Sequence, residues 1–180
     1  GNAIDASIAV QLALAVCLPN AGNIGGGGFM ICRMEDGQAY ALDFREKAPK
    51  KAFKNMYLDD NNQIIDSLST YGSLSVGIPG TIDGIFEAHK KLGSIDIDIL
   101  FNYAIQLAEI GFPITKRQAD KLNYYQQDFI KYNPKNNYLQ NDKWQEYDTL
   151  KQLDLANTLK IIRDKGCDGF YKGEVAESII

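Results

Sequence analysis

The sequence predicts a fold of the α+β class, in which helices pack beside a small number of strands. Several long segments carry apolar residues at the spacing of a helix face. Two short apolar runs, residues 29–34 and 38–45, flank the turn residues Glu35, Asp36 and Gly37, which is the pattern of a hairpin. Because helices and strands must each bury an apolar face, this combination favours a mixed architecture.

The composition excludes several classes of protein. The 180 residues are 45% apolar and 23% charged, which is ordinary for a globular chain of one domain or a large piece of one. The formal net charge is −4, and the densest basic cluster, Lys50, Lys51 and Lys54, lies close to Glu46 and Asp59. This cluster is typical of a solvated surface, so no nucleic-acid partner is expected. No segment reaches about 18 consecutive apolar residues, so no membrane span is expected.

A long helix is predicted over residues 3–17, which are apolar almost all round and are therefore expected to be buried on most faces. Asn2 and Asp5 suit its N-terminal end, where acceptors meet unpaired backbone N–H groups. Pro19 ends the helix, and four consecutive glycines occupy residues 25–28.

The predicted hairpin follows these glycines. Residues 29–34 are expected to form a buried strand and residues 38–45 its return strand. The two-residue period of the return strand places Tyr40, Leu42 and Phe44 on one face, and Ala39, Ala41, Asp43 and Arg45 on the other. On the second face, two alanines beside a paired Asp and Arg leave room for a small polar ligand.

The rest of the chain is predicted to alternate irregular segments with helices. Residues 47–73 are polar and irregular, with a loop tip at 59–62, and residues 74–78 are a short extended stretch. Apolar stripes predict helices from just after Pro79 to Leu92 and over residues 96–110, 115–130, 154–165 and 174–180, with a loop over residues 132–147.

The glycine run does not match a nucleotide-binding motif. A phosphate loop needs Gly-Lys-Ser/Thr at the start of a helix, whereas Phe29 and Met30 follow this run. A dinucleotide fingerprint needs a strand before the glycines and a helix after them, and here the order is reversed. A run without Cβ atoms is interpreted instead as a place where two backbones approach closely inside a core.

Metal and triad chemistry have little support. His89 is the one histidine of the sequence and lies on an amphipathic helix, so it is interpreted as a packed or half-exposed helix residue. Cys17, Cys32 and Cys167 lie far apart without metal-binding spacing and are interpreted as small buried hydrophobes. No metal and no cofactor is expected.

Two interpretations of Arg45 stay open on the residues alone. Its planar guanidinium can hold a carboxylate through two parallel hydrogen bonds, which a lysine cannot reproduce. An arginine at a strand end more commonly makes a surface or structural ion pair, here with Asp43 or Glu46.

Six segments, spread over nearly the whole chain, carry a resemblance that no single one of them would establish. They are GNAIDA at 1–6, GGGGFM at 25–30, DFREKAP at 43–49, SVGIPGT at 75–81, AIQLAEIGFP at 104–113 and GFYKGE at 169–174. In order and spacing they resemble the start of the large subunit in the γ-glutamyltransferase (glutathione hydrolase) family.

The resemblance implies an N-terminal nucleophile (Ntn) hydrolase with an αββα sandwich, of which this chain would form a part. In that family a precursor cuts itself into a large and a small subunit. The new N-terminal Thr of the small subunit attacks the γ-glutamyl amide of glutathione or a related compound, and a glutamyl-enzyme ester forms. Water or an acceptor amino acid or peptide then takes the glutamyl group. The implied partners are therefore γ-glutamyl compounds and the small subunit of the same precursor.

The resemblance also assigns site residues. Arg45 matches the family's arginine that holds the α-carboxylate of the glutamyl group, and Glu46 matches a position that we assign to positioning. Residue 1 is Gly, so no catalytic residue is expected in this chain. Residues 1–180 are expected to be an N-terminal portion of the large subunit, truncated at both ends and without the small subunit. The isolated chain is expected to be inert, to expose apolar surface and to self-associate.

Two alternatives remain. Poly-γ-glutamate-cleaving enzymes and cephalosporin acylases are relatives of the same fold, and Arg45 weighs against the acylases because it favours a substrate with a free α-carboxylate. A non-catalytic binding module that keeps the fold is the alternative from another class. By analogy with bacterial relatives, the location is expected to be periplasmic or secreted.

Overall fold

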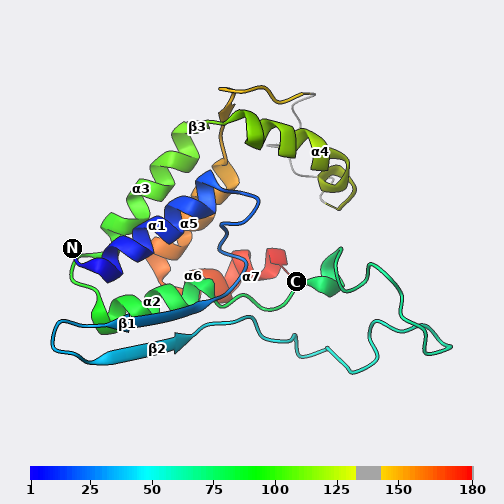
Figure 1. Ribbon diagram of the computed structural model, residues 1–180, viewed down its shortest axis with the longest axis horizontal. Coiled ribbons are helices and arrows are strands. Elements are labelled where there is room, and N and C mark those ends of the chain that lie inside the picture. Colours follow the sequence, from blue (N-terminus) through cyan, green and yellow to red (C-terminus); the bar gives the residue numbers. More distant parts are fainter. Residues whose placement is uncertain (133–142, 180) are drawn as a thin grey trace. The chain divides into compact units, whose positions relative to one another are not determined.

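A computed structural model of the chain describes residues 1–132 and 143–179 (Figure 1). It contains both helices and strands, which confirms the α+β class. The chain forms two compact units. We call Gly1–Asn23 together with Ile85–Ile180 the helical unit, and Ile24–Gly84 the hairpin unit.

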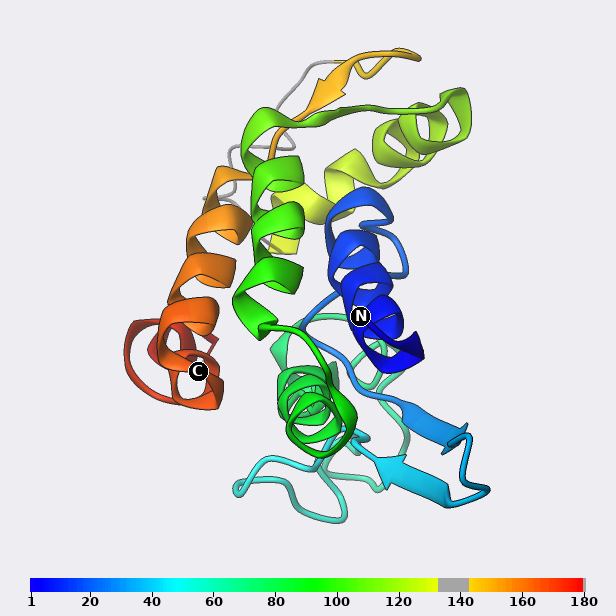
Figure 2. The same cartoon turned by 90° about the vertical axis from the view of Figure 1, so that its left-hand side faces the viewer.

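Three helices form the centre of the helical unit: α1 (Ala3–Cys17), α3 (Ile97–Ile110) and α5 (Leu153–Lys165). α3 packs against both α1 and α5, and Figure 2 shows it between them. Apolar residues at helical spacing face these contacts, as the sequence predicted, and bury Ile8, Leu12, Phe101, Ala104, Leu159 and Ile162. Each of the larger of these side chains, Ala104 excepted, stabilises the fold by about 1.5–3 kcal/mol when it is fully buried.

α1 begins as the sequence predicted, but it is not buried on most faces. The Asn2 side chain accepts hydrogen bonds from the backbone of Ile4 and Asp5, and the Asp5 carboxylate accepts one from the backbone of Asn2, which makes a capping box. Val10 and Leu14 are exposed. The expected burial is wrong for this chain because the described helices pack on one side of α1 and leave the other uncovered.

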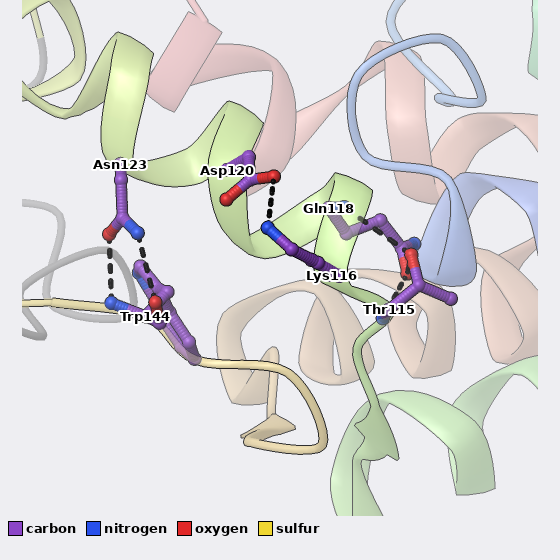
Figure 3. Close-up of polar contacts among 6 residues, drawn as sticks. All are labelled: Thr115, Lys116, Gln118, Asp120, Asn123 and Trp144. Atoms are coloured by element: carbon purple, nitrogen blue, oxygen red, sulfur yellow. Dashed lines mark hydrogen bonds and ion pairs between the residues drawn. The ribbon is translucent and has the colours of Figure 1, made fainter.

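A second, smaller core lies around α4 (Lys116–Tyr132), β3 (Phe112–Pro113) and β4 (Thr149–Leu150). It buries Ile114, Ala119, Leu122, Trp144 and Leu150. Figure 3 shows the polar contacts that hold α4. Asn123 donates to the Trp144 carbonyl at 2.9 Å and accepts from its N–H at 2.8 Å, while Thr115 and Gln118 cap the start of the helix and Lys116 pairs with Asp120.

Two of the remaining helices lie where the sequence predicted them, as α2 (Thr81–Leu92) and α7 (Gly173–Ile179). The short helix α6 (Cys167–Tyr171) was not predicted. Of the loop predicted over 132–147, Tyr132 closes α4, the segment 143–147 forms turns, and 133–142 lies outside the described residues. None of the helices in the described part of the chain is long and apolar enough to cross a bilayer.

The hairpin unit contains β1 (Phe29–Arg33) and β2 (Ala39–Asp43), which pair antiparallel with Phe29 opposite Asp43 and Arg33 opposite Ala39. Gly37 takes a φ of 86° in the turn between them, so the predicted turn is confirmed. Most of the chain from β2 to α2 is irregular, as predicted. The stretch expected to be extended over 74–78 starts instead inside a 3₁₀ turn, η1 (Ser73–Ser75), whose Ser75 hydroxyl donates to the carbonyl of Gly72.

The expectation of a buried strand over residues 29–34 is wrong. The side chains of Phe29 and Ile31 are 64% and 84% exposed. Their sheet has two strands, and within the hairpin unit the face that carries Phe29 and Ile31 is uncovered. Apolar residues at strand spacing predict a packing partner for the strand, and the hairpin unit by itself supplies none for this face.

Candidate ligand-binding site at Arg45

Backbone hydrogen bonds fix the chain on both sides of Arg45. On one side, Phe44 and Gly28 exchange N–H···O bonds of 3.0 and 3.3 Å. On the other side, Lys47 and Ile78 exchange bonds of 3.0 and 2.8 Å. The backbone N–H of Arg45 itself donates to the Asp43 carboxylate at 3.0 Å. Arg45 therefore lies on a short, well-fixed segment within the hairpin unit, although β2 itself ends at Asp43.

The glycine run makes this arrangement possible. The Gly26 carbonyl accepts hydrogen bonds from the N–H groups of Gly80 and Thr81, at 2.8 and 3.0 Å. A Cβ atom on Gly27 would lie 2.5 Å from the Phe44 carbonyl oxygen, which is too close for any residue other than glycine. The predicted close approach of two backbones is confirmed. It does not take place inside a core, however, because Gly25 and Gly27 are exposed.

The Arg45 side chain is 62% exposed and contacts Glu46 and Phe29. Its Nε lies 3.1 Å from a carboxylate oxygen of Glu46, and its Cζ lies 5.7 Å from the centre of the Phe29 ring. Residues that face each other across an antiparallel pair share a face, so Phe29, Asp43 and Arg45 lie on the same side of the hairpin. Among the described residues the guanidinium pairs through its Nε, and its exposed side chain can present the Nη groups to a carboxylate ligand.

The sequence left Asp43 and Glu46 open as partners of the Arg45 side chain, and the structure selects Glu46. Asp43 accepts from the Arg45 backbone instead. The pKa of the Glu46 carboxyl is lowered, first by a hydrogen bond from its own backbone N–H and then by the Arg45 side chain. Glu46 is therefore charged at neutral pH, and it lies against the Nε edge of the guanidinium.

Other candidate residues do not form a site. His89 bonds through Nε2 to the Ile95 carbonyl at 2.7 Å, which confirms it as a packed helix residue. Cys17, Cys32 and Cys167 form no disulfide among the described residues and are half-buried, so the interpretation as buried hydrophobes holds only in part. Within residues 1–132 and 143–179, no group of three or more His, Cys, Asp and Glu side chains is placed to hold a metal ion.

A second surface feature lies on α4. An open depression of 520 Å³ is lined by six of its side chains: Lys116, Arg117, Asp120, Lys121, Tyr124 and Tyr125. Lys116 and Asp120 are paired with each other (Figure 3). All of these residues come from one helix, so the depression lacks the convergence of several elements that a ligand site usually shows.

Two residues of the Arg45 site were missed from sequence. Phe29 is its aromatic neighbour, and the hairpin register set by the turn at Gly37 would have placed it opposite Asp43. Gly84 packs against Phe44, and the signal for it is a glycine in the interior of a helix, where it costs about 1 kcal/mol relative to alanine.

Comparison with known proteins places these features in a family. The family model described as Gamma-glutamyltranspeptidase matches residues 1–180. Curated glutathione hydrolase proenzymes of Pseudomonas sp. (strain A14) and Pseudomonas aeruginosa are each 47% identical over 100% of this chain and 32% of their own length. The crystal structure of Helicobacter pylori gamma-glutamyltranspeptidase is similar with a TM-score of 0.95 and 46% identity, over 99% of this chain and 52% of that one.

The fold and the site together define an α+β chain in which Arg45 is exposed on a backbone segment fixed by hydrogen bonds on both sides. The chain belongs to the gamma-glutamyltranspeptidase family. It spans about a third of the length of the curated relatives it matches.

Proposed function

We propose that this chain is part of a self-processing enzyme that cleaves the γ-glutamyl amide of glutathione and related compounds. The family membership supports this function. The structural observation that supports it is the geometry of Arg45. Its backbone is fixed on both sides while its guanidinium stays exposed. A glutamyl group carries an α-carboxylate, and a fixed arginine fork is the side chain best suited to hold one.

In the proposed chemistry, one chain of the precursor supplies the nucleophile and the other binds the substrate. The N-terminal Thr of the small subunit attacks the γ-carbonyl, the amine leaves with a proton, and a glutamyl ester of the Thr remains. Water or an acceptor amine then attacks the ester and releases the Thr. In this scheme Arg45 binds the α-carboxylate and Glu46 orients the guanidinium, so both hold the substrate without taking part in bond making.

We further propose that the complete fold is the αββα sandwich of the Ntn hydrolases. The uncovered face of the hairpin supports this, because exposed Phe29 and Ile31 call for a covering layer. The small subunit of the same precursor is the proposed partner.

The alternatives receive less support. The two Pseudomonas relatives are named glutathione hydrolase proenzymes, which does not favour a polyglutamate-cleaving or acylase function. An acylase substrate without an α-carboxylate would leave the Arg45 fork without a partner. The absence of a cofactor, the inertness of the isolated chain and the periplasmic or secreted location all stay predictions.

The test of this function uses the complete processed protein and compares two arginines on the same hairpin face. Arg45→Ala should lower kcat/KM for a γ-glutamyl donor by about a hundredfold or more, because a charged anchor of this kind contributes about 3 kcal/mol. Arg33→Ala is the matched control, since Arg33 is exposed on the same face at the other end of the hairpin. Equal activity of both variants and the unsubstituted protein would contradict the proposed role of Arg45.

A further inference from the structure

The ring of Phe44 packs on glycines. A Cβ atom on Gly84, in the first turns of α2, would lie 2.3 Å from Phe44 Cγ. A Cβ atom on Gly28 would lie 3.0 Å from Phe44 Cε2. A contact of 2.3 Å would force Phe44 to move. The movement would be large, because Cγ is the ring atom bonded to Cβ and not the end of a flexible side chain.

The backbone of Phe44 is confined as closely as its ring. A Cβ atom on Gly80 would lie 2.1 Å from the Phe44 carbonyl oxygen, and Gly28 holds the Phe44 N–H and carbonyl in two hydrogen bonds. The ring and the main chain of Phe44 therefore have little freedom to move independently of each other. All of these contacts lie within the hairpin unit.

Arg45 follows Phe44 directly. The Phe44 ring packs on Gly84, whereas the Arg45 guanidinium lies near the Phe29 ring. Any displacement of Phe44 by a larger residue at position 84 is passed through one peptide bond to Arg45. A bidentate arginine–carboxylate contact depends on direction, so a shift on the order of 1 Å is enough to weaken it.

We propose that Gly84 is a positioning residue for the substrate carboxylate, acting through Phe44 on Arg45. This inference rests on the proposed function, since it assumes that Arg45 holds the α-carboxylate of a γ-glutamyl donor. A helix-interior glycine is otherwise unfavourable, and alanine at this position would strengthen α2 were it not for the ring of Phe44.

The experiment measures steady-state kinetics of the complete processed protein with a γ-glutamyl anilide. Gly84→Ala should raise KM for the donor by about tenfold or more and change kcat by less than about threefold, because uniform binding is lost while the reacting groups are intact. Lys90→Ala, at an exposed position of the same helix, should leave both constants unchanged.

Two further variants separate positioning from general damage. In the double variant Phe44→Ala with Gly84→Ala, the Phe44 atoms that would lie 2.3 and 2.7 Å from the new methyl group, Cγ and Cδ2, are gone. KM should therefore return toward that of Phe44→Ala alone. In an Arg45→Ala background, Gly84→Ala should add no further rise in KM, because the group on which it acts is gone.

Each outcome decides the question. An unsubstituted protein without γ-glutamyl activity would refute the proposed function itself. With an active protein, an unchanged KM in Gly84→Ala, or an undiminished KM effect of Gly84→Ala in the Arg45→Ala background, would refute the role of Gly84. If Gly84→Ala does not fold, the double variant decides: recovery of folding and of KM supports the contact with Phe44, and failure to recover overturns it.

Discussion

At the scale of single residues, the site combines a backbone that hydrogen bonds hold on both sides of Arg45 with an exposed Arg45 side chain. The sequence singled out Arg45 through the resemblance of residues 43–49, and its role in binding a substrate stays a prediction. It could not choose between Asp43 and Glu46 as partner. Asp43 is used locally, since its carboxylate accepts the N–H two residues on, and this leaves Glu46 to pair with the guanidinium.

The buried carboxylate of Asp5 is held by several hydrogen bonds. Its side chain is 2% exposed and accepts hydrogen bonds from the Asn2 N–H, the Ser94 N–H and the Ser94 hydroxyl. Burial alone would raise its pKa, but the hydrogen bonds from Ser94, Asn2 and Ile95 outweigh burial and hold the pKa well below its ordinary value. Asp5 therefore ties the start of α1 to the segment that follows α2.

Asp5→Asn should lower the free energy of unfolding by about 1–3 kcal/mol at neutral pH. The reason is that the side-chain NH₂ group of the new Asn would face the hydrogen-bond donors that now bind the carboxylate. The lowered pKa means that the unfolded chain binds a proton more readily than the folded one. The contribution of Asp5 is therefore complete above about pH 5 and is lost as the pH falls through about 4 and below. Thermal unfolding between about pH 7 and pH 3 measures this. The difference in unfolding temperature between the original and Asp5→Asn proteins should shrink toward low pH. A difference that stays constant would contradict the role given to the Asp5 carboxylate. Asp60→Asn, in an exposed loop, is the control.

At the scale of elements, the C-terminal end of α1 is completed by side chains from distant segments. Gln118 donates to the Cys17 carbonyl at 2.7 Å and Gln152 donates to the Val16 carbonyl at 2.8 Å. These carbonyls have no partner within the helix, so side-chain donors replace the water that would otherwise solvate them. Gln152 is buried, which makes its contact the less replaceable of the two.

Gln152→Leu should destabilise the protein by about 1–3 kcal/mol, because it leaves the Val16 carbonyl buried without a donor. Gln106→Leu provides a matched control on an exposed face of α3, with an expected change within about 0.5 kcal/mol. Urea unfolding of both variants measures the difference. Equal midpoints would show that water or another donor takes the place of Gln152.

The helices were predicted more accurately than the strands, because the signals for a helix lie within its own segment of the sequence. Residues 3–17, 96–110 and 154–165 carry their apolar stripes and end signals within one segment, and α1, α3 and α5 match them within a residue or so. The burial of β1 was predicted wrongly because it depends on what packs against the strand. The role of Gly84 was also missed, since its partner Phe44 lies 40 positions earlier.

At the scale of the whole molecule, the chain leaves apolar surface uncovered in both units. Phe29 and Ile31 are exposed on the hairpin, and Val10 and Leu14 are exposed on α1. The chain also spans about a third of the length of its curated relatives. We propose that the rest of the precursor covers these faces, and self-association of the isolated chain stays a prediction.

The central claim is that the chain works as part of a self-processing γ-glutamyl enzyme. The measurement that tests it most directly is the mass and N-terminal residue of each chain after the complete precursor is expressed and incubated. We predict two chains, of which the smaller begins with Thr. A single uncut chain that is stable over days would contradict the claim and leave Arg45 as an ion pair at the end of a strand.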